Sequence, residues 1–359
     1  MKTTLCTLFN SLYLDKGLVL YDSLKELAKD FELYVLCMDD KCYDILNDID
    51  DEQLKPIRLE DFENSELLSV KKERKLGEYF WTCSSWLISY ILDNYHPQSC
   101  SYIDADMYFY QDPSVLIEEM GKKKASVLIV GHRFHPLLFE ERSRIVGRYC
   151  VEFNTFKNED SAKNVLDVWK RQVIERCSLD GDGIHWGDQK YLDNWTEDYD
   201  FVIETSNLGA GVAPWNLSQY RLYSDKDSIV LKHDSGVITP LVFYHFENIQ
   251  YLDEHMVNAN IECFKGTDLR LIKLLYCDYL KKIRNKKILL KEKYGIDVLI
   301  TSHVGVQSDS TPISAKIVKG VKRFAYQLSD CKNYVMRLRR ILNCYLPAYL
   351  HKQYNIISF

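Results

Sequence analysis

The stretch that decides the predicted fold runs from Cys100 to Pro113 and reads C-S-Y-I-D-A-D-M-Y-F-Y-Q-D-P. Its first part, Ser101 to Ile103, predicts a buried strand, and two carboxylates, Asp104 and Asp106, stand at the carboxyl end of that strand. Aspartate is depleted in strands and costly to bury without a partner, so the pair indicates a bound cation. Side chains at i and i+2 of an extended segment point the same way, and hard oxygen ligands suit Mg²⁺ or Mn²⁺. The stretch therefore predicts a metal site that can neutralise a diphosphate.

The Asp-x-Asp pattern alone does not identify a metal site, because it recurs in four other places in the chain. Those pairs lie in acidic, glycine-containing or turn-like surroundings, where solvated surface is the expected environment. Only Asp104 and Asp106 follow an apolar strand and precede a second aromatic run, Met107 to Tyr110. A structural turn is the alternative for this pair. The other four pairs are Asp48/Asp50, Asp180/Asp182, Asp198/Asp200 and Asp225/Asp227.

The amino-terminal segment predicts a parallel crossover unit. Thr3 to Phe9 is an apolar strand, the spacing of apolar residues from Gly17 to Asp30 predicts an amphipathic helix, and Phe31 to Met38 is a second apolar strand. Ligands of such sheets gather at the carboxyl ends of the strands. Asn10 and the pair Asp39-Asp40 fall at that edge, where the aspartates serve either as ligands or as a helix cap.

The same alternation continues through the body of the chain and predicts an α/β fold with a mostly parallel sheet flanked by helices. Further predicted strands are Pro56 to Leu59, Ala125 to Val130, Tyr149 to Phe156, Ile229 to Lys232 and Leu241 to Tyr244; predicted helices are Val70 to Asp93, Ser114 to Met120 and Ser161 to Cys177.

Several polar residues at the ends of these elements can have either a structural or a functional role. Lys75 is either a solvated helix residue or a diphosphate contact, and Asp188 is either a helix-dipole carboxylate or a catalytic group. The glycine-punctuated loop from Gly209 to Asn216 allows close backbone approach to a ligand, but it lacks the setting of a dinucleotide or P-loop motif. A lone histidine such as His245 is more often structural than a metal ligand.

Composition and charge exclude several classes of protein. The chain has 359 residues, and its high aromatic content with 25 tyrosines indicates a folded protein. Its 11 cysteines lack zinc-site spacing, which predicts reduced, buried thiols in a cytoplasmic protein. We expect no signal peptide and no membrane span. The whole chain has a net charge of −6, and its body is acidic, which argues against a nucleic-acid partner.

The carboxyl-terminal part is basic and predicts a separate segment. From Thr311 onward the sequence contains nine lysines and arginines but only one acidic residue, Asp330. We divide the chain into a body (residues 1–262), a basic helical segment with a linker (263–310) and an amphipathic basic helix (311–359). That last helix predicts peripheral contact with an anionic inner membrane face, or docking on the body or a partner instead.

A set of ordered motifs resembles bacterial glycosyltransferases of the GT-A fold related to glycosyltransferase family 8, which use sugar nucleotides. The resemblance covers roughly residues 1 to 260. Its motifs are L-C-T-L-F-N at Leu5 to Asn10, D-A-D at Asp104 to Asp106, G-H-R-F at Gly131 to Phe134, E-F-N-T-F at Glu152 to Phe156, W-G-D-Q-K-Y-L at Trp186 to Leu192, A-P-W-N at Ala213 to Asn216 and Y-H-F at Tyr244 to Phe246.

The resemblance implies roles for individual residues. Asp104, Asp106 and His245 match the metal-binding residues, and Asp188-Gln189 matches a pair beside the transferred sugar. Glu247-Asn248 replaces the usual glycine-containing loop and its lysine, which leaves diphosphate contacts to Arg133 or Lys75. The implied nucleotide-binding residues are Thr7, Phe9, Asn10, Asp39, Asp40 and Lys75, and those of the donor-sugar and acceptor pocket are Arg133, Asn154, Trp186, Gly211 and Trp215.

The implied activity is transfer of a sugar from a nucleotide diphosphate to a glycan or lipid-linked acceptor, with Mn²⁺ or Mg²⁺ as cofactor and with retention. Asp188 and Gln189 then stabilise an oxocarbenium-like transition state; in an inverting enzyme, Asp188 is the general base instead. The alternatives are a sugar-nucleotide hydrolase, a nucleotidyltransferase or a catalytically inactive scaffold. A nucleotidyltransferase usually has an early glycine-rich basic loop, which Leu5 to Lys16 lacks, and a scaffold would have lost site residues that are present here.

Overall fold

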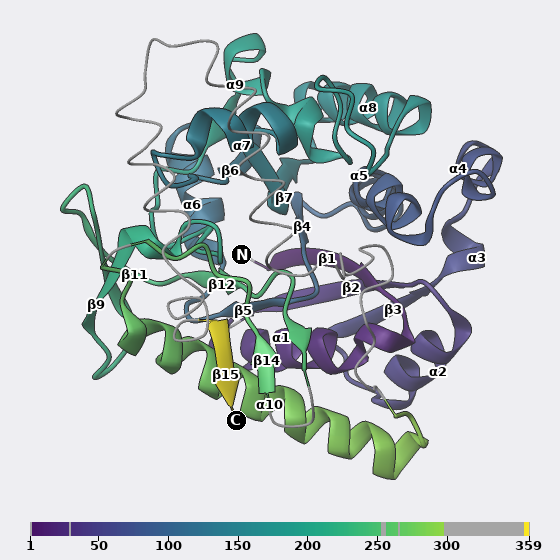
Figure 1. Ribbon diagram of the computed structural model, residues 1–359. Helices are drawn as coiled ribbons and strands as arrows, with labels where there is room; N and C mark the ends of the chain where they lie inside the picture. The colour runs from purple at the N-terminus through teal and green to yellow at the C-terminus, as the bar shows by residue number, and fades with distance from the viewer. Residues whose placement is uncertain (1, 29, 253–255, 265, 298–354, 359) are drawn as a thin grey trace, which may run out of the picture.

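The central sheet is formed by strands with apolar residues on both faces. The computed structural model describes residues 2–28, 30–252, 256–264, 266–297 and 355–358 (Figure 1). Within these residues, seven strands form one sheet in the order β3-β2-β1-β4-β7-β6-β8. All run in one direction except β7, which is antiparallel to both neighbours. The strands are β1 (Thr3–Phe9), β2 (Phe31–Cys37), β3 (Leu54–Arg58), β4 (Ser99–Ile103), β6 (Val127–Gly131), β7 (Tyr149–Lys157) and β8 (Val202–Glu204).

Helices cover both faces of this sheet. Since neighbouring side chains of a strand point to opposite faces, Leu5 and Phe9 of β1 join one apolar core, whereas Cys6 and Leu8 join another. The first core is covered by α1 (Leu14–Leu27), α2 (Asp40–Asp48) and α6 (Ser114–Lys122), and the second by α3 (Leu59–Phe62), α4 (Ser65–Lys71), α5 (Leu76–Tyr95), α8 (Asp160–Glu175) and α9 (Trp195–Asp198). The predicted α/β class, a mostly parallel sheet flanked by helices, is confirmed.

Strand β5 (Met107–Phe109) lies beside α1, and a short strand from the later part of the chain pairs with it (Figure 1). β5 pairs antiparallel with β12 (Phe243–His245), and the Asp104–Asp106 turn leads directly into β5. Two small sheets follow, and a third apolar cluster joins these strands to helix α10 (Leu269–Tyr294). The small sheets contain β9 (Tyr220–Ser224), β10 (Val230–His233) and β11 (Ile238–Pro240) in one, and β13 (Gln250–Tyr251), β14 (Met256–Asn258) and β15 (Ile356–Ser358) in the other. Helix α7 (Phe139–Val146) and the short 3-10 helices η1 (Ser11–Tyr13), η2 (Gln189–Leu192) and η3 (Leu217–Gln219) complete the described elements.

One predicted helix is two helices in the structure. We predicted a continuous helix from Val70 to Asp93, but α4 ends at Lys71 and α5 begins at Leu76. A carboxylate oxygen of Glu78 accepts a hydrogen bond from the backbone N–H of Lys75 at 2.9 Å, and this bond caps the first turn of α5. The interruption therefore comes from a local cap, which the apolar pattern across this region does not reveal.

The carboxyl-terminal prediction falls mostly outside the described residues. Helix α10 (Leu269–Tyr294) lies within the segment 263–310 that we predicted as basic and helical. Of the predicted amphipathic helix at 311–359, only residues 355–358 are described, and Ile356–Ser358 forms a strand that pairs with β14. Over the ranges that the structure describes, no helix has both the length and the apolar character needed to cross a membrane.

Candidate active site

His245 lies where two strand pairs meet. Because β12 pairs with β5, His245 stands opposite Met107, the residue that follows Asp106. The Nε2 atom of His245 lies 3.0 Å from Asp106 Oδ1 and 3.6 Å from Asp104 Oδ2. An imidazole and two carboxylates from distant parts of the chain therefore converge at the carboxyl edge of the central sheet.

A turn, and not an extended segment, brings the two aspartates together. Residues 104–106 lie between β4 and β5, and the backbone N–H of Met107 donates to the carbonyl of Asp104 at 3.4 Å. The N–H of Asp104 donates to the carbonyl of Glu152 on β7 at 3.1 Å. The two side chains thus lie together as the sequence indicated, but the geometry differs from the strand repeat that we expected.

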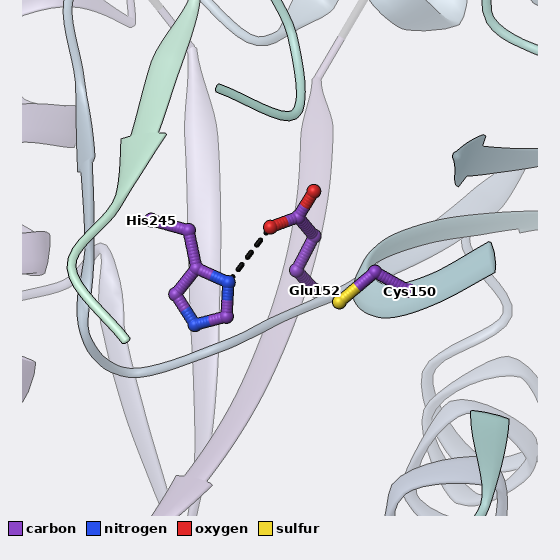
Figure 2. Close-up of side chains that lie close together, drawn as sticks. All are labelled: Cys150, Glu152 and His245. Carbon is purple, nitrogen blue, oxygen red and sulfur yellow. Dashed lines mark hydrogen bonds and ion pairs between the residues drawn. The ribbon is translucent and has the colours of Figure 1, made fainter. Parts of the chain in front are cut away.

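Glu152 holds His245 from the side opposite to the aspartates. Cys150 and Glu152 are alternate residues of β7 and share one of its faces. Glu152 Oε2 lies 2.7 Å from His245 Nδ1, and Figure 2 shows the other ring nitrogen pointing away from Glu152 and Cys150. Metal-binding histidines commonly have a carboxylate on their second nitrogen, which fixes the orientation of the ring. Glu152 is therefore a positioning residue for His245.

Cys150, Glu152 and His245 form a second group whose geometry could hold a metal ion, since their ligand atoms lie within 4.8 Å of one another. Burial raises the pKa of the Cys150 thiol, and the charge of Glu152 raises it further. A protonated thiol is a poor ligand, because the thiolate is the form that binds metals. The Nε2 side of His245, which faces Asp104 and Asp106, is the better candidate.

The cluster carries an excess of negative charge. Burial raises the pKa of Asp104 to about 6, and the neighbouring carboxylates of Asp106 and Glu152 contribute, while His245 opposes the shift. Burial lowers the pKa of His245, but Asp106 and Glu152 outweigh burial and raise that pKa well above its ordinary value. A divalent cation between these groups would relieve the carboxylate repulsion. Two carboxylates and an imidazole are a donor set that fits such an ion.

Asp188 joins the cluster from the α5 side of the sheet. It is 4% exposed, and its Oδ2 accepts a hydrogen bond from Ser84 Oγ at 2.6 Å. Burial raises the pKa of Asp188 to about 7, and the charge of Asp104 contributes while the Ser84 hydroxyl opposes the shift. Asp188 precedes η2 but makes no side-chain capping hydrogen bond there. Its side chain is thus held by Ser84 and interacts electrostatically with Asp104. Both interpretations of Asp188, as a helix-dipole carboxylate at the amino end of η2 and as a catalytic group, stay predictions.

Trp215 and Asn154 border the same region. The Trp215 ring centroid lies 5.5 Å from that of His245, and its indole N–H donates to the carbonyl of His132 at 2.7 Å. Asn154 stands opposite Tyr102 of β4, is fully buried, and has no hydrogen-bond partner for its side-chain amide among the described residues. An unpaired buried amide is costly, so Asn154 is available for a ligand.

Gln189 and Trp186 flank Asp188 in the sequence. The Gln189 amide nitrogen donates to the carbonyl of Val146 at 2.8 Å, which ties η2 to the end of α7. Trp186 is half-buried, and its ring lies against Gly181, where an added Cβ would come within 2.9 Å of it. Their roles toward the transferred sugar stay predictions.

Apart from Lys75, which precedes α5, the predicted nucleotide-binding residues stand toward the carboxyl ends of β1 and β2, on the same edge as the aspartates. Thr7 is buried, and its hydroxyl has no hydrogen-bond partner in the part of the chain that the structure describes. Phe9 is also buried. The Asn10 side chain accepts a hydrogen bond from Leu12 N at 3.2 Å, which caps η1.

At the end of β2 the helix-cap reading applies to one of the two aspartates. Asp39 Oδ1 accepts a hydrogen bond from the Cys42 N–H at 2.8 Å and caps α2. Asp39 Oδ2 accepts from the N–H of Ser11 at 2.9 Å and links β2 to η1. Asp40 is exposed and lies 3.8 Å from Arg58. A nucleotide-binding role for either aspartate remains a prediction.

Two predicted cationic contacts are engaged elsewhere. The Arg133 guanidinium donates to the carbonyls of Asn207 at 3.3 Å and Ala210 at 2.9 Å. These bonds hold the segment that leads to the 209–216 loop. The Lys75 side chain is largely exposed, and its Nζ lies 3.6 Å from Asp180.

Comparison with known proteins identifies a family but no reaction. No protein-family model matches the sequence. YfnF of Bacillus subtilis (strain 168) is 30% identical over 290 residues, which cover 79% of this chain and 93% of YfnF. The chain belongs to the same family as YfnF. YfnD of the same organism is 29% identical over 283 residues, which cover 77% of this chain and 88% of YfnD. YfnF and YfnD are both described as uncharacterized, so membership of the YfnF family does not assign an activity.

Solved structures with similar chains include three sugar transferases. Mouse xyloside xylosyltransferase 1 is 14% identical, with 69% of this chain and 98% of that chain covered and a TM-score of 0.45. The galactosyltransferase LgtC is 10% identical, with 79% and 96% covered and a TM-score of 0.49. GlyE of Streptococcus pneumoniae TIGR4 is 13% identical, with 58% and 47% covered and a TM-score of 0.39. At these scores the activity of the YfnF-family chain has to be argued from its own site.

Sequence reasoning missed two residues of this YfnF-family site. Glu152 had a visible signal, because it is a charged residue inside an otherwise apolar strand. Ser84 had none, since serine is common in helices and its partner Asp188 lies 104 residues away in the chain.

Gly211 supports the YfnF-family site through its backbone conformation, and we expect Gly211→Ala to destabilise the fold. Gly211 has φ +73°, and an added Cβ would lie 2.5 Å from Val130 Cγ1 and 3.1 Å from Glu152 Oε1. We expect a loss of about 1–3 kcal/mol of unfolding free energy, measured by urea denaturation. Gly121→Ala in α6, where nothing lies within 4 Å, is the control and should be neutral or stabilising. Equal stability of both variants would contradict this role.

Proposed function

We propose that the protein is a metal-dependent glycosyltransferase, related to glycosyltransferase family 8, that moves a sugar from a nucleotide diphosphate with retention of configuration. The acceptor that we propose is a glycan or a lipid-linked glycan of a cell-surface polysaccharide. Transfer would take place at the carboxyl edge of the central sheet, where α/β sheets bind their ligands.

The observation that carries the proposal is the convergence of Asp104, Asp106 and His245 at this edge, with Glu152 behind the imidazole and Asp188 on the α5 side. Asp106, Glu152 and Asp188 are buried and Asp104 is half-buried, and carboxylates this close together in such surroundings are costly for folding unless a cation joins them. The arrangement is what a site needs in order to bind a divalent ion and the diphosphate that the ion neutralises.

Asp104, Asp106 and His245 would hold Mn²⁺ or Mg²⁺, which when bound supplies Lewis-acid stabilisation of the departing nucleoside diphosphate. The imidazole nitrogen favours a transition metal over Mg²⁺, so Mn²⁺ suits the set better. Glu152 keeps the Nε2 atom of His245 directed at the aspartates, because its carboxylate lies 2.7 Å from Nδ1.

Asp188 and Gln189 would act on the sugar. An oxocarbenium-like transition state develops positive charge at the anomeric carbon, which a buried carboxylate stabilises more strongly than a solvated one. The Ser84 hydroxyl donates to Asp188 at 2.6 Å and keeps this carboxylate in place. The Gln189 amide nitrogen bonds the Val146 carbonyl, which leaves the amide oxygen as the group for the sugar. The unpaired amide of Asn154 would bind sugar hydroxyls.

The test is a panel of sugar nucleotides offered to the full-length protein with Mn²⁺, with Mg²⁺ and with a chelator. We expect one nucleotide class to raise the melting temperature only with metal, because a ligand stabilises a protein according to its affinity and concentration. The same donor should be slowly hydrolysed to free sugar and nucleoside diphosphate when no acceptor is present. Release of a sugar phosphate would identify cleavage of the diphosphate instead and contradict glycosyl transfer. A folded, metal-loaded sample without any shift or release would contradict it too.

A further inference from the structure

Lys16 places a buried ammonium group near the aspartate cluster. It lies in the first turn of α1 and is only 8% exposed. Its Nζ lies 3.6 Å from the centroid of the Tyr13 ring. Among the described residues, no carboxylate oxygen lies within the 4.0 Å limit of an ion pair with this nitrogen. Lys16 is therefore a buried cation that is held over an aromatic ring and is not neutralised by direct contact with an acid.

Because α1 packs against β5, Lys16 and Asp106 lie at about the same distance from the contact between these two elements. The Phe109 N–H donates to Ser23 Oγ at 3.2 Å, which fixes one contact between the two elements. Lys16 precedes Ser23 by two turns, a rise of about 10 Å on the same face of the helix. Asp106 precedes Phe109 by about 10 Å of extended chain. The two side chains also interact electrostatically with one another, as opposite charges at short range do.

The two other cations that we considered for a phosphate have different surroundings. Arg133 donates from Nη1 to the carbonyls of Asn207 and Ala210, and its Nε lies 3.6 Å from Glu204 Oε1. Lys75 is an exposed side chain beside Asp180. Lys16 differs from both because it is buried, lacks an acidic partner in contact, and lies next to a proposed metal ligand.

We propose that Lys16 binds the diphosphate of the donor, next to the metal site formed by Asp104, Asp106 and His245; this inference rests on the proposed function. The Tyr13 ring holds the ammonium by a cation–π contact, and an ammonium has three N–H groups with which it can donate to phosphate oxygens. A lysine serves as a point charge for phosphate, and its charge-assisted hydrogen bonds strengthen as the departing diphosphate gains negative charge. Lys16 thus both binds the donor and stabilises the leaving group.

The experiment measures binding of magnesium pyrophosphate to the full-length protein by calorimetry, because pyrophosphate is a diphosphate without base or sugar. We expect Lys16→Met to weaken binding at least about tenfold and Lys16→Arg to retain most of it, since a charge-assisted hydrogen bond is lost only in the first. Lys286→Met is the matched control, because Lys286 also contacts α1, through Asp22 at 2.7 Å, but on the surface. Affinity for Mn²⁺ alone should be unchanged or tighter in Lys16→Met, which separates loss of a phosphate contact from collapse of the site.

Each outcome decides between the two proposals. Pyrophosphate affinity of Lys16→Met within twofold of the wild type would overturn the role of Lys16 and leave the glycosyltransferase proposal standing. Weakened Mn²⁺ binding together with a lower melting temperature in Lys16→Met would overturn it too, by showing a structural role. If the wild type itself bound neither pyrophosphate nor any nucleoside diphosphate with metal, both the Lys16 inference and the proposed function would fail.

Discussion

Asp106→Asn is expected to abolish sugar transfer while the protein stays folded. Asparagine has nearly the same shape as aspartate but removes one charge from the group that faces His245 Nε2 at 3.0 Å. A metal-bound leaving group gains several kcal/mol of stabilisation, and each 1.36 kcal/mol is a tenfold change in rate. We therefore expect turnover to fall by about 10³-fold or more, measured as nucleoside diphosphate release from the donor identified by the panel.

A matched control for this variant exists in the same chain. Asp227 is the second aspartate of another Asp-x-Asp pair and is exposed, so Asp227→Asn should keep full activity. Mn²⁺ affinity, followed by calorimetry, should fall in Asp106→Asn and stay unchanged in Asp227→Asn. Activity above a tenth of the wild-type rate in Asp106→Asn would rule out a metal site at this residue.

Asp188→Asn is expected to lower kcat by about 10²- to 10³-fold with little effect on donor affinity, because a preorganised charge acts mainly on the transition state. The amide oxygen of asparagine can still accept the hydrogen bond that Ser84 donates at 2.6 Å, so the loop should keep its position. Steady-state hydrolysis of the donor gives kcat and KM separately. Mn²⁺ binding should be unaffected, which distinguishes this variant from Asp106→Asn.

Asp198→Asn is the control for Asp188→Asn, since Asp198 lies in the neighbouring helix α9 and is exposed. It should match the wild type in kcat and KM. If Asp188→Asn lowered kcat less than threefold, or raised KM with kcat unchanged, Asp188 would serve substrate binding or structure and not the chemical step. In that case the stabilising group for the sugar would have to be sought elsewhere in the cluster.

The predicted elements and the observed ones agree best where the signal is local. The largely apolar run from Thr3 to Phe9 is strand β1 with the same bounds, because a strand with both faces covered buries residues at every position and is therefore rich in apolar and β-branched residues. The break before α5 was missed because Glu78 makes it through one side-chain bond to the backbone of Lys75. The apolar periodicity on both sides of the break is continuous, so no pattern marks the cap.

The residues of the candidate site also differ in whether a local sequence signal marks them. Asp104 and Asp106 were found from their position after an apolar strand, which is information contained in a few adjacent residues. His245 entered as a metal residue only through the family resemblance, and Glu152 was not assigned at all. Glu152 and His245 are 93 residues apart in the chain and Asp106 and His245 are 139 apart, and only the pairing of β12 with β5 and of β7 with β4 brings them together.

The sequence by itself determined the α/β class and the edge of the sheet at which polar residues gather, because hydrophobic periodicity and strand ends are properties of neighbouring residues. The tertiary structure decided which of those polar residues act together. It placed His245 between Glu152 and the aspartates, and it lets Ser84 donate a hydrogen bond to Asp188. It also directs the Arg133 guanidinium to a backbone carbonyl and places the ammonium of the buried Lys16 over the Tyr13 ring. These contacts depend on strand register and helix packing, which are settled by the burial of the whole core and not by any short stretch of the chain.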